Sequence, residues 1–336
     1  WLCVWLRTPI PWMLGPLLAT GIASVLGQPT RSAAPLRNLG QWTIGAALGL
    51  YFTPQVTALV ASLWWAVLLG VLWSLLLGWA FSAWLHRQHA ATYGGTAQQN
   101  RATSYYAGAI GGASEMTLLA ERDGARTDLV AAAHSMRLLV VTVVVPFVFT
   151  WTGLHGIDTQ PPGLRELRWD ALAWLAGATL AGVWLVRAAG RSNLWFVGAL
   201  AVSIGLTVAG WEPSAIPAWL SNAAQLFIGV SLGVRFSPAF LQTAPRWLAA
   251  VALGTLVMIA LCAGFAWLLS LGTGLHPATL VLGTAPGGIA EMAITAKVLQ
   301  LGVPVVTAFQ VCRLVAVLLL ARPIFALLAR RRPGAG

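Results

Sequence analysis

Residues 111–116 read GGASEM and residues 287–292 read GGIAEM, so one pattern of two glycines, a glutamate and a methionine occurs twice, 176 positions apart. Each copy interrupts an otherwise apolar stretch of the chain. An ionisable side chain inside a membrane segment is costly and is a functional candidate by default. The two stretches therefore point to a duplicated fold with one polar site in each half.

Composition places the chain in a lipid bilayer. Of its 336 residues, 58% are hydrophobic and only 9% are charged, and the mean hydropathy is +0.77. Soluble domains carry about 25% charged residues. We therefore predict an all-α integral membrane protein, because helices satisfy their own backbone groups in lipid. The net charge of +11 resides mostly in short loops between apolar runs, where it orients the spans and does not indicate nucleic-acid binding.

The chain reads as an internal duplication. Four segments of the first half match four of the second in the same order: 11–27 with 194–210, 41–54 with 225–238, 101–116 with 277–292, and Arg137-Leu138 with Arg313-Leu314. Gln41 and Gln225 are identical between the halves, and each arginine follows its glutamate by 22 residues. We expect a first membrane repeat at 1–152, trimmed at its N-terminus, a polar linker at 153–169 and a second membrane repeat at 170–336, with about five spanning helices in each repeat.

The loop charges predict that the two repeats are inverted. In the first half, the first and third loops carry arginines and the second carries none. In the second half, only the second of the three equivalent loops carries them, as Arg235 and Arg246. Positively charged loops face the cytoplasm, so equivalent loops are expected on opposite sides of the membrane. Inverted repeats of this kind are typical of secondary transporters.

The Gly-Gly segments are too short to cross a membrane in one helix. From Gly112 to the charged loop at 121 the helix has about nine residues, or roughly 14 Å, which is half of a hydrocarbon core. This length predicts a broken or re-entrant hairpin whose tip carries Gly111 and Gly112 in the first repeat and Gly287 and Gly288 in the second. Non-crossing segments also satisfy the odd number of spans that inversion requires.

Two glutamates and two arginines are the principal candidate site residues. Glu115 and Glu291 lie one turn past each tip, near the expected midplane, beside helix N-termini that favour an anion. The functional interpretation makes them proton or cation carriers, with Arg137 and Arg313 helping to hold an anionic substrate. The structural alternative is that each glutamate pairs with its arginine only to neutralise buried charge. Both interpretations remain open at this point.

Other polar positions in the spans have weaker claims. Gln41 and Gln225 join the candidate substrate or ion site because they recur by identity. His134 and its counterpart Gln310 are interpreted as polar helix–helix contacts, and the spacing Gly45-x-x-x-Gly49 as close helix packing. The sequence contains no motif of a known enzyme, so we expect no enzymatic activity, no cofactor and no metal site.

The whole chain resembles the bacterial AbrB-type membrane proteins, which are defined by a duplicated hydrophobic domain. The resemblance rests on the two GG-x-x-EM motifs, on PWMLGPLLA at 11–19 and on the repeated IGxxLGxxF. It implies a multi-pass protein of the bacterial inner (plasma) membrane. Family members are often labelled transcriptional regulators or putative ammonia monooxygenases. Neither label follows from these residues, because five scattered histidines do not make a copper site and no soluble DNA-binding domain is visible.

Two functions from different classes follow. The first is a secondary transporter of a small polar or anionic metabolite, coupled to protons or a cation, with its substrate site between the two hairpins. Its expected partners are the lipid bilayer and the small-molecule or ion substrate, with no direct contact to nucleic acid and with a homodimer as a further option. The alternative is a membrane-bound regulator of gene expression that acts without transport. The shortness of the loops disfavours this alternative.

Overall fold

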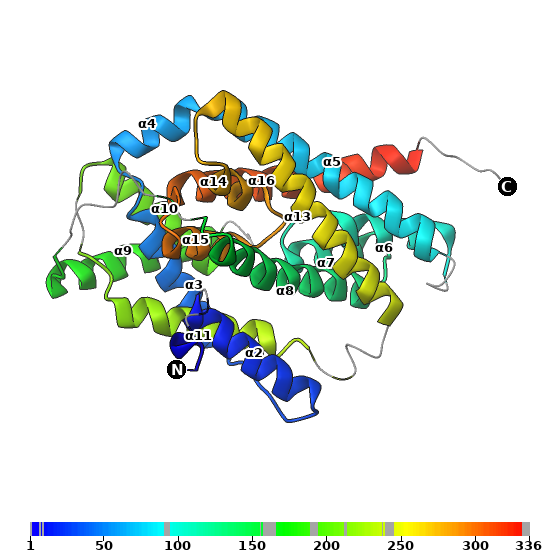
Figure 1. The fold of residues 1–336 in the computed structure, drawn as a ribbon, viewed down its shortest axis with the longest axis horizontal. Coiled ribbons are helices and arrows are strands. Elements are labelled where there is room, and N and C mark those ends of the chain that lie inside the picture. Colours follow the sequence, from blue (N-terminus) through cyan, green and yellow to red (C-terminus); the bar gives the residue numbers. More distant parts are fainter. Residues whose placement is uncertain are drawn as a thin grey trace.

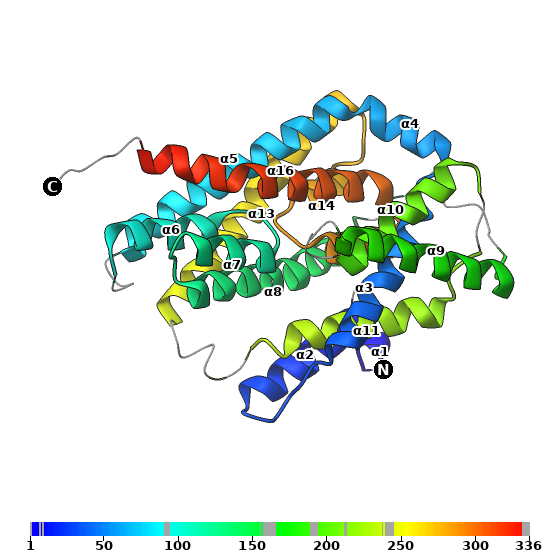
Figure 2. The ribbon, with the colours of Figure 1, turned by 180° about the vertical axis from the view of Figure 1, so that it is seen from behind.

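All regular secondary structure in the described residues is helical. The computed structural model describes residues 2–6, 8, 10–90, 95–154, 156, 166–188, 194–211, 214–236, 238 and 245–330. Its helices, labelled in Figures 1 and 2, are α1 (Leu2–Trp5), α2 (Pro11–Val25), α3 (Ala34–Gly49), α4 (Pro54–Ser62), α5 (Trp64–His89), α6 (Ala97–Gly108), α7 (Ala113–Arg122), α8 (Thr127–Trp151), α9 (Trp169–Ala188), α10 (Leu194–Val208), α11 (Ala218–Gly233), α13 (Pro245–Thr273), α14 (Pro277–Thr284), α15 (Ile289–Val298) and α16 (Val303–Arg330).

Several helices have the length and composition of membrane spans. In the described part of the chain, α5, α8, α9, α13 and α16 meet both conditions, and α3 with α4 would add a sixth span bent by 88°. The apolar helices α2 and α10 have 15 residues each. They reach roughly 22 Å, which is less than a hydrocarbon core of about 30 Å. The expectation of about five spanning helices per repeat is therefore met only in part by helix length.

Proline and threonine decide where the short helices begin. Pro54 opens α4 after the break at 50–53, at a first helical position where its missing N–H costs no helical hydrogen bond. The hydroxyl of Thr53 caps this helix by accepting from the Val56 backbone N–H at 3.3 Å. Thr96 caps α6 in the same way, accepting from the Gln99 N–H at 3.2 Å. The Thr-Pro pair at the end of the 41–54 stretch thus accompanies the sharp bend between α3 and α4.

The helices form two groups that pack against each other. The first group contains α2, α3, α9, α10 and α11, and the second contains α5 to α8 and α13 to α16. Figure 1 shows α2, α9 and α11 on one side of the molecule and α5, α6 and α13 extending on the other, and Figure 2 shows the same arrangement from behind. Both groups mix helices from the two sequence halves, so the buried cores are shared between the halves.

Glycines allow the closest contacts in the first helix group. Gly45 and Gly49 of α3 face α10, where an added Cβ would overlap the Phe196 carbonyl and the Ser203 side chain. Gly229 and Gly233 of α11 face α2 in the same way. This close approach confirms the interpretation of the repeated Gly-x-x-x-Gly spacing as a helix-packing motif.

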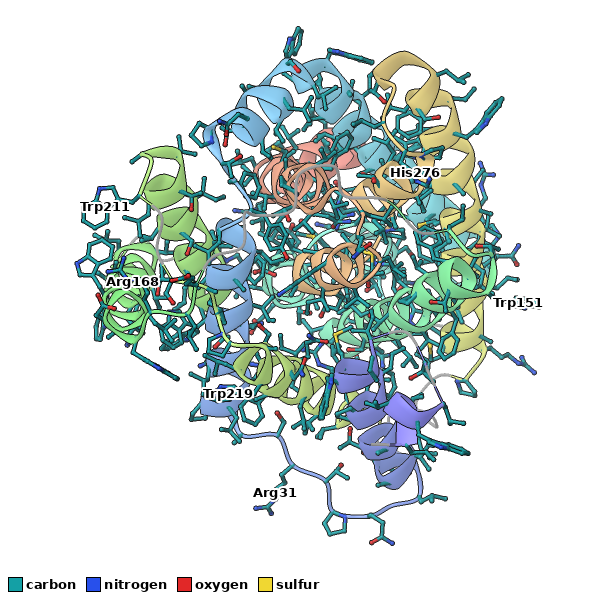
Figure 3. All side chains as sticks on the ribbon, turned by 60° about the vertical axis from the view of Figure 1, so that its left-hand side comes forward. Arg31, Trp151, Arg168, Trp211, Trp219 and His276 are labelled. Atoms are coloured by element: carbon teal, nitrogen blue, oxygen red, sulfur yellow. The ribbon has the colours of Figure 1, made fainter. Side chains whose placement is uncertain are left out.

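Exposed tryptophans surround the helix bundle. Trp151, Trp211 and Trp219 are 91%, 58% and 63% exposed, and Figure 3 shows them at the periphery of the molecule. Amphipathic tryptophan rings favour the boundary between lipid and water. Most of the linker expected at 153–169, namely 155 and 157–165, lies outside the described residues.

Candidate functional site

A cavity lies between the two helix groups and contains both Gly-Gly motifs. Its volume is about 370 Å³. The second group contributes the two breaks between α6 and α7 and between α14 and α15, together with residues of α8 and α16. The first group contributes residues from α3, α10 and α11. Nine of the ten candidate residues line it: Gln41, Gly111, Gly112, Glu115, Arg137, Gly287, Gly288, Glu291 and Arg313.

Both Gly-Gly motifs have the same local structure, which explains their residue pattern. Gly112 and Gly288 are the N-cap residues of α7 and α15, in extended backbone. A Cβ on either one would overlap Oε2 of the glutamate three positions later. A Cβ on the preceding Gly111 would lie 2.8 Å from Met116 Cε, and Gly287 has the same relation to Met292. The first glycine thus makes room for the methionine and the second for the carboxylate.

The glutamates occupy the third position of their helices. Glu115 and Glu291 are each 8% exposed. At this position a carboxylate lies beside the free N–H groups of the first turn and the positive end of the helix dipole, and it can fold back over the N-cap. The helix start therefore helps to stabilise a buried negative charge, and the same carboxylates face the cavity.

The two arginines bind the backbone at the helix breaks. Arg313 donates from Nη1 to the Ala285 carbonyl at 2.6 Å and from Nη2 to the Gly287 carbonyl at 2.7 Å. Arg137 Nη1 makes a longer contact of 3.5 Å with the Ala107 carbonyl. Within the described ranges, neither arginine forms an ion pair with a carboxylate. The pairing of each glutamate with its arginine, considered above as the structural alternative, is thus not what neutralises these guanidinium groups.

His134 and Gln310 hold the ends of the preceding helices. Gln310 Nε2 donates to the Leu282 carbonyl at 2.6 Å. His134 lies 2.9 Å through Nε2 from the Tyr106 carbonyl and 2.6 Å through Nδ1 from Arg137 Nη2. A carbonyl requires a donor and a guanidinium requires an acceptor, so the ring is assigned as neutral with its proton on Nε2. These bonds confirm the interpretation of both side chains as helix–helix contacts.

The first helix group contributes two charged cavity residues that the sequence analysis had assigned to loops. Arg37 lies on α3, one turn before Gln41, and Arg235 follows the end of α11; both line the cavity and both are half-buried. Sequence reasoning treated them only as charges that orient the spans. The four-residue spacing from Arg37 to Gln41 places both on one helix face and could have signalled this role. Gln225, in contrast, is buried on α11 and does not line the cavity.

The charges around the cavity interact with one another. Arg137 and Arg313 are close enough for mutual repulsion, and Arg235 interacts with both Glu291 and Arg37. In the described part of the chain, no three His, Cys, Asp or Glu side chains gather in a way that could hold a metal ion. The cavity is therefore a pocket of arginine and carboxylate charge enclosed by apolar helices, suited to a small charged ligand.

Several long apolar helices around this charged cavity indicate a helical, multi-pass membrane protein. A family model described as transition state regulatory protein AbrB matches residues 12–329, and the chain belongs to this family. It is 28% identical to the uncharacterized protein YhjN of Bacillus subtilis (strain 168), over 95% of this chain and 87% of that protein. It is also 25% identical to the putative regulator AbrB of Escherichia coli (strain K12), over 93% of this chain and 88% of that protein.

Proposed function

We propose that the protein is a secondary transporter of the bacterial inner membrane that carries a small polar or anionic metabolite together with protons or a cation. The observation that carries the proposal is the cavity of about 370 Å³ in which both Gly-Gly-x-x-Glu-Met motifs meet four arginines. Buried charge in an apolar helical protein is costly and is typical of a substrate or ion pathway. The volume of the cavity falls at the small end of the range of about 300–1,000 Å³ that is common for ligand sites.

The proposal includes two inverted repeats, and helix packing supports it. The contact between α3 and α10 has its counterpart in the contact between α11 and α2, and the contact between α8 and α13 has its counterpart in that between α16 and α5. Such exchanged pairs are expected when two halves are related by a twofold axis, and the alternating loop charges favour an axis in the membrane plane. The repeats would then interlock, with the cavity near the axis.

Re-entrant hairpins are the second part of the proposal. Helices α6, α7, α14 and α15 have 12, 10, 8 and 10 residues. None of them reaches about 30 Å, so each pair would enter the bilayer, turn at its glycines and leave on the same side. Irregular backbone at membrane depth requires burial or a polar cavity. The arginine bonds to the carbonyls at Ala285 and Gly287 supply partners for this backbone.

In this mechanism the cavity would open alternately to each side as one helix group moves against the other. Its half-buried lining residues include Arg37 at the start of α3, Trp195 at the start of α10 and Arg235 at the end of α11. The positive-inside rule assigns these three ends to the cytoplasm. We infer that this conformation faces inward, with Glu115 and Glu291 at its inner end taking up or releasing the coupling ion.

Carboxylate substitution tests the transport mechanism. Glu115→Gln and Glu291→Gln keep the side-chain shape but remove the charge, so uptake into proteoliposomes should lose its dependence on a proton or cation gradient. Glu121→Gln is the matched control, because Glu121 is an exposed residue of the same α7 helix and lies outside the cavity lining. If gradient-dependent uptake persists in both cavity variants, the proposed role of the two carboxylates in coupling is wrong.

A second candidate is a membrane-bound regulator of gene expression that acts without transport. The specific observation in its favour is the name of the Escherichia coli relative, putative regulator AbrB. The two candidates separate in cells that carry the Glu291→Gln variant. If a change in gene expression disappears together with uptake, regulation follows from transport. If the variant loses uptake but keeps the change in expression, the regulator acts directly.

A further inference from the structure

The cavity carries an excess of positive charge. Four arginines and two glutamates line it, so two positive charges remain even when both glutamates are ionised. His134 adds no charge because its hydrogen bonds assign it as neutral. A buried excess of charge is unfavourable unless a ligand compensates for it. The cavity is therefore complementary to an anion with two negative charges.

The inner arginines form the first of two pairs. Arg137 of α8 and Arg313 of α16 are only 3% and 5% exposed, and their charges repel each other. Two backbone carbonyls hold Arg313 in place, and Arg137 is held mainly by His134 Nδ1 at 2.6 Å. Two like charges that line the same cavity and repel each other are suited to one shared anionic group.

The second pair lies at the half-buried end of the cavity. Arg37 and Arg235 come from α3 and from the segment after α11, and their charges also repel each other. In the alignment of the two halves, Arg37 matches Ser221 and Arg235 matches Tyr51, and neither of these lines the cavity. We call Arg37 and Arg235 the outer pair. It has no counterpart among the cavity residues of the other half.

We propose that the substrate is a small linear dicarboxylate, with one carboxylate bound between Arg137 and Arg313 and the other between Arg37 and Arg235. This inference rests on the proposed transport function and narrows its substrate class. Planar carboxylates match the forked donors of guanidinium groups. A monocarboxylate would leave one arginine pair without an anion, and a single tetrahedral anion would reach only one pair.

Binding to the purified full-length chain in detergent tests the substrate class separately from transport. Thermal unfolding and calorimetry would compare linear dicarboxylates of increasing length with monocarboxylates of matched length, neutral diamides and sulfate. A ligand that binds the native state raises the apparent stability. We expect an optimum length among the dicarboxylates, with at least about tenfold weaker binding of the other compounds.

Substitution of the outer pair tests the binding mode. Arg37→Gln and Arg235→Gln should weaken dicarboxylate binding by at least about tenfold and leave the weak monocarboxylate affinity within about twofold. Arg187→Gln is the matched control, since this exposed arginine of α9 lies outside the cavity lining. Arg137 and Arg313 are left unchanged because they also hold the backbone.

Three results would overturn the inference: equal affinity for matched monocarboxylates or sulfate, no effect of either outer variant, or no stabilisation of the monodisperse protein by any dicarboxylate. Uptake of the tightest dicarboxylate into proteoliposomes then tests transport itself. If the dicarboxylate binds at the arginines but is not carried across the membrane, the substrate class stands and the transport proposal fails. If a cation or neutral solute is carried and dicarboxylates do not bind, transport stands and the dicarboxylate fails.

Discussion

The glycines of each motif differ in the neighbour that each one accommodates. Gly287 lies against Met292, which is fully buried, whereas Gly288 lies against the carboxylate of Glu291 in the cavity. A methionine locked in a core resists displacement, and a carboxylate at the end of a flexible side chain does not. At the scale of single residues, the motif therefore combines a packing requirement with a positioning requirement.

Adjacent alanine substitutions should separate these two requirements. Gly288→Ala should move the Glu291 carboxylate and impair ligand binding or gradient coupling, with a loss of stability of only about 1 kcal/mol at the N-cap. Gly287→Ala should cost about 1–3 kcal/mol through overpacking against Met292. Thermal unfolding and ligand binding, measured on both variants, check this. Equal losses of stability and of binding in the two variants would contradict the division of roles.

At the scale of elements, the contact between α3 and α10 depends on backbone approach. An added methyl group at Gly45 would meet the Phe196 carbonyl, which belongs to a helix backbone and cannot yield as a side chain can. Gly229 has the same relation to Met13 across the contact between α11 and α2. The glycines of the repeated IGxxLGxxF phrase thus set the distance between two helices, whereas Ile228 and Arg235, which lie within its second copy, line the cavity.

Alanine at these interface glycines should separate the helices and lower stability. Gly45→Ala and Gly229→Ala should each cost about 1–3 kcal/mol, because the neighbouring backbone must shift. Gly205→Ala on α10 is the control, since a Cβ there meets nothing within 4 Å. It should leave stability unchanged or raise it by up to about 1 kcal/mol, because alanine favours helix. The measurement is the apparent Tm of the purified variants. If the Gly205→Ala control lowered the Tm as much as the interface variants, the packing role would be refuted.

At the scale of the whole molecule, the proposed inversion makes the two halves interlock rather than fold side by side. Each helix group contains helices of both halves, and the cavity lies between the groups. The site would therefore be assembled only when the complete chain is folded. A single half would lack the partner for α3, which is α10, and the partner for α2, which is α11.

Site-directed labelling tests the inversion. Gln98, in the first turn of α6, and Leu271, in the last turn of α13, are exposed and stand in equivalent regions of the two halves. In a background without Cys3, Cys262 and Cys312, cysteines at these two positions should react with a membrane-impermeant thiol reagent from opposite sides of the membrane. Labelling of both positions from the same side would show that the repeats are parallel.

The sequence by itself determined the all-helical, apolar class, the family and the two motifs that hold the cavity carboxylates. These features depend on composition, on local spacing and on repeated phrases, which are visible along the chain. The tertiary structure alone decided that Arg37 and Arg235 join the cavity, that Gln225 does not, and that Arg137 and Arg313 bind backbone carbonyls. The physical reason is that these contacts join segments far apart in sequence. An arginine that orients a span and an arginine that lines a cavity look the same until the helices are packed.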